Sequence, residues 1–87
     1  MTMQEAIRQR MIDLMQENGL NTSELARRAG LTQSTVNGIL KGSVKNPTVQ
    51  SIYLIAGAMG LSLDQFFVSR YFQNIDIENL KRKQPLE

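Results

Sequence analysis

The chain lacks cysteine, histidine and tryptophan altogether. Without thiols it forms no disulfides, so a fold of 87 residues must be stabilised by packing alone. The missing thiolates and imidazoles also exclude a zinc site of the usual ligand types, and they exclude Ser–His and Cys–His catalysis. We therefore expect neither a metal nor another cofactor.

Long apolar runs are also missing. The longest uninterrupted stretch of apolar residues and glycine, residues 54–61, is far shorter than the roughly 20 residues of a membrane-spanning helix. Residues 2–16 mix charged and apolar side chains throughout, unlike a signal peptide. We expect a cytoplasmic protein without a membrane partner. The final pair, Leu86-Glu87, is typical of a vector-derived ending and is left out of the functional reasoning.

Acidic side chains are few and scattered. Apart from Glu87, the carboxylates are those of Glu5, Asp13, Glu17, Glu24, Asp64, Asp76 and Glu78. No two of them form a spaced pair on one predicted helix face beside an apolar cleft, and the chain has no glycine-rich phosphate loop. The sequence therefore indicates a binding protein rather than an enzyme.

A chain of 87 residues with an ordinary hydrophobic content of 41% can form one small domain. The net charge is only +2, but its distribution is uneven. Between residues 20 and 50, four cations (Arg27, Arg28, Lys41 and Lys45) stand against one acid, Glu24, which leaves a local charge of +3. A basic segment in a near-neutral chain is typical of a nucleic-acid face, although ordinary solvated surfaces show the same imbalance as often.

Residues 1–67 predict five short helices joined by short connections. A side chain able to cap a helix N-terminus precedes each one: Thr2, one of Asn21, Thr22 and Ser23, then Thr32, Thr48 and Ser62. Glycines stand where the first four helices should end: Gly19, Gly30, Gly42 and Gly60. The pattern predicts an all-α orthogonal bundle over residues 1–67, followed by a short C-terminal extension over residues 68–87.

Residues 22–41, TSELARRAGLTQSTVNGILK, meet the steric requirements of a helix-turn-helix unit. Ala26 stands where the two helices must cross closely, and Gly30 stands in the turn, where a positive φ favours glycine. Val36 and Ile39 lie three residues apart on the second helix and face back onto the first. Together these four residues predict two helices at roughly 90–120°, with the second exposed on the surface.

These motifs resemble the phage lambda-type repressor and Cro family, also called the XRE family of helix-turn-helix regulators. The resemblance spans residues 3–67 and rests on Ser23-Glu24-Leu25-Ala26 through Gly30, Gln33-Ser34-Thr35-Val36, Gly42, Asn46-Pro47-Thr48 and Gly60-Leu61-Ser62-Leu63-Asp64. It implies a five-helix lambda-repressor-like domain that binds double-stranded DNA sequence-specifically. The protein would act as a bacterial or phage transcriptional regulator, expected to be a repressor. Residues 33–41 would form the recognition helix in the major groove.

The outward side chains near the start of that helix are Gln33, Ser34 and Asn37. Glutamine can bind adenine through N6 and N7, and serine can bind several bases. The resemblance implies base contacts at Gln33 and Ser34, and we expect a third at Asn37. The alternative is that Gln33 and Ser34 are merely polar residues that favour the helix start.

Gly38 also falls on the face expected toward DNA, and we include it among the base-contacting residues. A glycine inside a helix costs about 1 kcal/mol relative to alanine. Close approach of the backbone to a base pair would explain it, and simple neutrality is the other explanation.

Phosphate contacts are expected around the base-contacting residues, because helix N-termini favour anions and cations attract phosphates. In relatives the start of the second helix lies against the DNA backbone, although many carry Gln where Thr22 stands here. Thr35, at the edge of the face, is placed to touch a phosphate or a thymine methyl group. The full set is Asn21, Thr22, Ser23, Thr35, Lys41, Lys45 and Asn46. At least one of Arg27 and Arg28 is expected to be ordinary solvated surface.

The extension carries more apolar residues than an idle tail needs: Tyr71, Phe72, Ile75, Ile77 and Leu80. They can pack back on the domain, form a dimer interface or fold upon a partner. We expect a homodimer on a pseudo-palindromic operator, with contacts from Phe67, Val68, Tyr71 and Phe72. The alternative is an antitoxin-like module that binds a protein partner through the extension. Asp76 is expected to cap a final turn. Lys81-Arg82-Lys83 are expected to be a solvated end, with a supplementary phosphate contact as the alternative.

Overall fold

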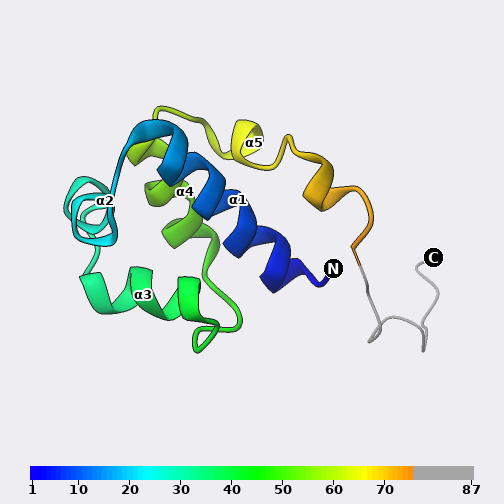
Figure 1. Cartoon of the computed structure of the whole chain (residues 1–87), viewed down its shortest axis with the longest axis horizontal. Coiled ribbons are helices and arrows are strands. Elements are labelled where there is room, and N and C mark those ends of the chain that lie inside the picture. The colour runs from blue at the N-terminus through cyan, green and yellow to red at the C-terminus, as the bar shows by residue number, and fades with distance from the viewer. Residues whose placement is uncertain (76–87) are drawn as a thin grey trace.

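Five α-helices and one short 3-10 helix follow one another in the computed structural model, which describes residues 1–75 (Figure 1). The elements are α1 (Met3–Asn18), α2 (Thr22–Ala29), α3 (Gln33–Lys41), α4 (Val49–Ala58), α5 (Leu63–Phe66) and the 3-10 helix η1 (Arg70–Phe72). Residues 1–75 contain no strand, and the predicted all-α, five-helix architecture is confirmed. The expectations for Asp76, Ile77, Leu80 and Lys81-Arg82-Lys83 lie outside the described residues. No helix in the described range is long and apolar enough to cross a bilayer.

Each α-helix begins at a side chain that accepts a hydrogen bond from the first turn. The Thr2 hydroxyl accepts from the Glu5 N–H at 3.2 Å, and the Glu5 carboxylate accepts from the Thr2 N–H at 2.8 Å. Such a reciprocal pair satisfies two backbone donors that a helix start leaves without partners. Of the three candidates for the start of α2, Asn21 is the cap, with Glu24 as its reciprocal partner. The expected caps of α3, α4 and α5 are confirmed as Thr32, Thr48 and Ser62.

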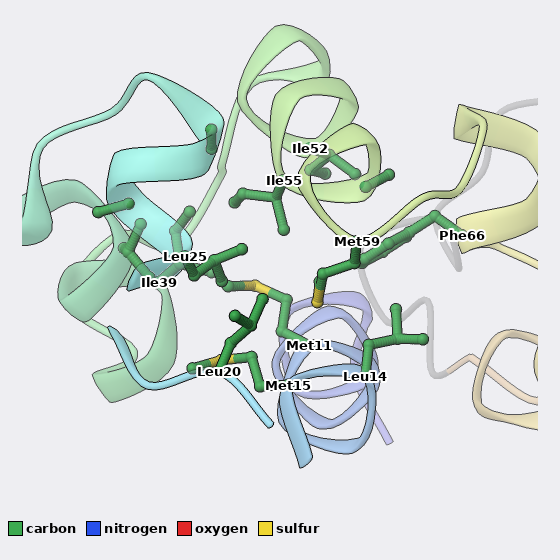
Figure 2. Close-up of a cluster of buried hydrophobic side chains, with 14 of the residues drawn as sticks. Met11, Leu14, Met15, Leu20, Leu25, Ile39, Ile52, Ile55, Met59 and Phe66 are labelled. Carbon is green, nitrogen blue, oxygen red and sulfur yellow. The ribbon is translucent and has the colours of Figure 1, made fainter. Parts of the chain in front are cut away.

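Apolar side chains from all five α-helices meet in one core, most of which is drawn in Figure 2. The largest of the fully buried side chains are Phe66, Met11, Leu25, Ile55 and Val36. Among residues 1–75 no polar or charged residue is buried. The core therefore carries no desolvation penalty for buried charge, and burial of apolar surface stabilises the fold.

Helices α2 and α3 form the helix-turn-helix unit and contact each other directly. Ala26 on α2 is buried, as are Val36 and Ile39 on α3. Gly30 between them has φ +72°, and the next N–H, that of Leu31, donates to the Ala26 carbonyl at 3.0 Å. The turn is thus closed by a backbone hydrogen bond. In Figure 1, α3 lies at one edge of the molecule, away from α5 and η1.

Packing continues beyond residue 67 into the extension, where η1 lies against α1. The Arg10 guanidinium of α1 donates to the carbonyls of Phe66 at 2.6 Å and Gln65 at 2.9 Å. The Tyr71 hydroxyl donates to the carboxylate of Asp13 on α1. The extension could pack back on the domain, form a dimer interface or fold upon a partner. Residues of η1 pack back on the domain.

The four residues expected at a dimer interface differ in their surroundings. The rings of Phe67 and Phe72 lie with their centroids 4.8 Å apart, and the Tyr71 hydroxyl is hydrogen-bonded to Asp13. Val68, by contrast, is 72% exposed. Three of the four thus make contacts within the chain, and the dimer contact stays a prediction.

The Tyr71–Asp13 hydrogen bond changes the titration of both partners. It is the main cause that lowers the pKa of Asp13, and a second bond from the Gln9 amide at 3.0 Å adds to it. The same bond raises the pKa of Tyr71. A lowered acid pKa stabilises the fold above the unfolded value, about 3.9, and that contribution is lost as pH falls through the folded value. A raised tyrosine pKa stabilises the fold below about 10, and that contribution is lost at higher pH.

Tyr71→Phe should lower the melting temperature at neutral pH, because it removes the bond that favours ionised Asp13. The difference from the wild type should be constant between about pH 4 and 10 and should shrink below that window, where Asp13 becomes protonated in both proteins. Thermal melts from pH 2 to pH 7 measure it. Tyr53→Phe, at an exposed tyrosine on α4, is the matched control. A Tyr71→Phe difference equally large at pH 2 would contradict the assignment.

Candidate nucleic-acid interface

The outer surface of α3 is a shallow, open hollow. It is lined by Gln33, Ser34, Asn37, Gly38, Lys41 and Ser43. Gln33 and Ser34 are exposed in the first turn of α3, and Asn37 follows one turn later, half-buried. The structure thus brings all four of the residues expected to contact bases to one surface. It adds Lys41, which was expected to contact a phosphate, and Ser43.

The side chains of this hollow are available to a ligand. Within residues 1–75, those of Gln33, Asn37 and Lys41 make no hydrogen bond or ion pair with the protein, and neither does the Ser34 hydroxyl. The Ser43 hydroxyl reaches the Gly38 carbonyl at 3.4 Å. Exposed amides, hydroxyls and an ammonium group are the donors and acceptors that recognise base edges and phosphates.

The segment of the chain that carries this hollow is rich in positive charge. From residue 25 to residue 63 the sequence contains no Asp or Glu, whereas Arg27, Arg28, Lys41 and Lys45 all lie in that range. All four cations are exposed, and none is paired with a carboxylate in the part of the chain that the structure describes. The surface around α3 therefore attracts polyanions.

The N-terminal end of α2 is less open than the sequence suggested. The Asn21 side-chain oxygen accepts from the Glu24 N–H at 2.8 Å, and the Glu24 carboxylate accepts from the Asn21 N–H at 3.0 Å. Asn21 thus serves α2 as its cap, and the Glu24 carboxylate lies at the same end of the helix. Thr22 and Ser23, the first two residues of the helix, keep side chains without a hydrogen bond inside the described range.

The Thr35 hydroxyl lies 2.8 Å from that of Thr32, which caps α3. One of its hydrogen-bonding positions is therefore occupied inside the helix start. Lys45 and Asn46 lie exposed in the loop after α3.

Gly38 lines the hollow without a side chain, and its contact with a base stays a prediction. It is buried, and its carbonyl accepts from the N–H groups of Gly42 at 3.1 Å and Val44 at 3.0 Å. A Cβ atom added at Gly38 would lie 2.7 Å from Cγ2 of Val44. The group that excludes a side chain at Gly38 is thus a methyl group of Val44 in the same chain. Neither explanation offered by the sequence included it.

Sequence reasoning missed two features of the hollow. Lys41 shares the surface of Ser34 and Asn37, and the spacing of three and four residues between them was a signal that helical periodicity contains. Ser43 lies beyond the helix, where periodicity ends, so no sequence pattern indicated it. In residues 1–75 no group of three or more His, Cys, Asp or Glu side chains is arranged to hold a metal ion.

Comparison with known proteins gives a family and a structural relative. Residues 11–66 match the family described as helix-turn-helix. The chain is also similar to the protein in the crystal structure of the prophage Lp1 protein 11, with a TM-score of 0.74 and 31% sequence identity. The similarity covers 85% of this chain and 97% of that one. No curated protein matches the chain significantly.

Asn21→Ala should destabilise the fold by about 1 kcal/mol, because it removes the cap of α2 and leaves a backbone donor of the first turn without a protein partner. Asn21→Asp keeps the acceptor and should cost much less. Urea unfolding of both variants beside the wild type measures the difference. Equal midpoints for the alanine variant and the wild type would show that the cap contributes nothing.

Proposed function

The chain belongs to the XRE-type helix-turn-helix family of DNA-binding transcription regulators, and we propose that it represses transcription by placing α3 in the major groove of an operator. The observation that carries the proposal is the outer surface of α3. Polar side chains without partners in the described range line a hollow there, on a helix held rigidly by its buried face. The major groove of B-DNA, about 12 Å wide, admits a helix of this kind.

Gln33, Ser34 and Asn37 are the proposed base contacts. They lie in the first five residues of α3, and the N-terminal residues of a recognition helix are those that reach base edges. Glutamine and asparagine amides pair with adenine through N6 and N7, which favours A·T pairs in the operator.

The proposed phosphate contacts lie on both sides of this group. Lys41, Lys45 and Asn46 belong to the end of α3 and the loop after it, and Thr22 and Ser23 belong to the start of α2. Asn21 and Thr35 are weaker candidates, because their side-chain oxygens already bond within the helix starts. Such contacts position the protein on DNA without specifying sequence.

A symmetric pair of chains is the proposed binding form. The nine residues of α3 contact only a few base pairs, which discriminates poorly within a genome. Two copies would present their recognition helices about 34–36 Å apart on a pseudo-palindromic site in the cytoplasm. Val68 is the exposed member of the expected dimer contact.

An antitoxin-like role would need a protein-binding surface on the extension. In the extension, Tyr71 is hydrogen-bonded to Asp13 of α1, and Phe72 packs against the core. The similarity to a prophage protein supports regulation in a phage or bacterial setting. The observations therefore favour the DNA-binding role.

Gln33→Ala should weaken binding to the preferred operator by about 1–3 kcal/mol and relax the preference at one base position. Selection of bound sequences from random DNA, followed by titration of the selected site, measures both effects. Gln50→Ala removes an exposed glutamine of α4 outside the hollow and serves as the matched control. A Gln33→Ala protein that selects the same sequence with the same stringency would refute the base contact. A wild-type protein that selects no sequence would refute the function.

Lys45→Ala should weaken binding to every sequence alike and leave the selected site unchanged. The plot of log K against log salt concentration should become shallower by about 0.9, the contribution of one phosphate contact on B-DNA. Titrations between 50 and 200 mM salt, on the preferred and on a scrambled site, provide the measurement. An unchanged slope would remove Lys45 from the contact surface.

A further inference from the structure

The loop after α3 is attached to the middle of that helix through one residue. The Gly38 carbonyl accepts hydrogen bonds from the N–H groups of Gly42 and Val44, at 3.1 and 3.0 Å, and the Ser43 hydroxyl approaches it at 3.4 Å. The first of these is an ordinary helical bond, whereas the others come from residues that have already left the helix. The chain thus folds back over the last turn of α3.

A side chain at Gly38 would prevent this return. The added Cβ would lie 2.7 Å from Cγ2 of Val44, closer than carbon atoms can pack, but 3.7 Å from its Cβ, an ordinary contact. Val44 cannot easily move Cγ2 aside, because its β-branched side chain has few rotamers and packs against the core. The conflict therefore rests on a single methyl group, and the loop must shift to relieve it.

The loop that would shift carries groups of the candidate interface. Ser43 lines the hollow of α3, and Lys45 and Asn46 follow Val44 directly and are exposed. We infer that Gly38 is a positioning residue, which holds residues 43–46 against α3 and so presents Ser43 and Lys45 beside the base-contacting side chains. The inference rests on the proposed function, because the loop is argued here to meet the DNA backbone.

Gly57 shows that the steric demand at Gly38 is specific to that position. It also lies inside a helix, α4, yet a Cβ there would meet nothing within 4 Å. Gly57→Ala therefore gains the helix propensity of alanine without a conflict and should raise the melting temperature by a few degrees. Gly38→Ala gains the same helix propensity. Any decrease in the melting temperature of this variant therefore comes from the conflict with Val44.

The experiment compares four variants with the wild type: Gly38→Ala, Val44→Ala, the double variant Gly38→Ala/Val44→Ala, and Gly57→Ala. Amide hydrogen exchange follows the Gly42 and Val44 N–H groups, and DNA titrations at several salt concentrations follow the phosphate contacts. In Gly38→Ala the hydrogens of both amides should exchange severalfold faster. The slope of log K against log salt concentration should become shallower by about 0.9, the contribution of one phosphate contact. Its selected DNA sequence should stay that of the wild type.

The double variant should restore both the exchange rates and the salt dependence, because Val44→Ala removes the methyl group that collides. A positioning role predicts this rescue, whereas a general loss of stability predicts further weakening. If Gly38→Ala alone does not fold, a folded double variant with the wild-type salt slope supports the inference equally. Unchanged exchange and slope in Gly38→Ala, or a double variant without rescue, would overturn it. If the wild type selects no DNA sequence, the proposed function fails while the exchange measurement still decides the role of Gly38.

Discussion

The close packing of α2 against α3 is the constraint on which the rest of the molecule depends. Ala26 is buried on α2, and Val36 and Ile39 are buried on α3. Overpacking there would displace α3, because protein interiors are close-packed and transmit such changes. The position of the hollow and of every candidate contact on α3 follows from this contact.

A buried apolar face and an open polar face on the same short helix support the proposed recognition of DNA by the nine residues of α3. Apolar packing on the core fixes the buried side of α3. The polar side chains on its outer side therefore keep their hydrogen-bonding groups available. Rotation or sliding of α3 would expose Val36 and Ile39 to water, so the polar face is held in one orientation. Binding then requires little further ordering of the backbone, which favours affinity.

The extension strengthens the opposite side of the domain. The rings of Phe66, Phe67 and Phe72 contact one another edge-on or tilted, and Arg10 ties the end of α5 to α1. In Figure 1, α5 and the segment that follows it lie away from α3. The contacts of α5 and η1 thus add to the core on a part of the domain other than the outer surface of α3, the proposed recognition surface.

The sequence alone determined the features that depend on residues close together along the chain. Helix caps pair residues three apart, as Thr2 and Glu5 do, and glycine turns depend on a single backbone conformation. The five helices, the helix-turn-helix unit and the polar residues of α3 were therefore predictable. The family resemblance was carried by the same local motifs.

Only the tertiary structure decided which surfaces remain open. The burial of Gly38 depends on the return of the loop through Val44, and the place of Tyr71 depends on Asp13, 58 residues away. Ser43 lines the hollow because the same loop returns over α3. A local pattern states what a residue can contact, whereas the path of the folded chain decides what is already in contact with it.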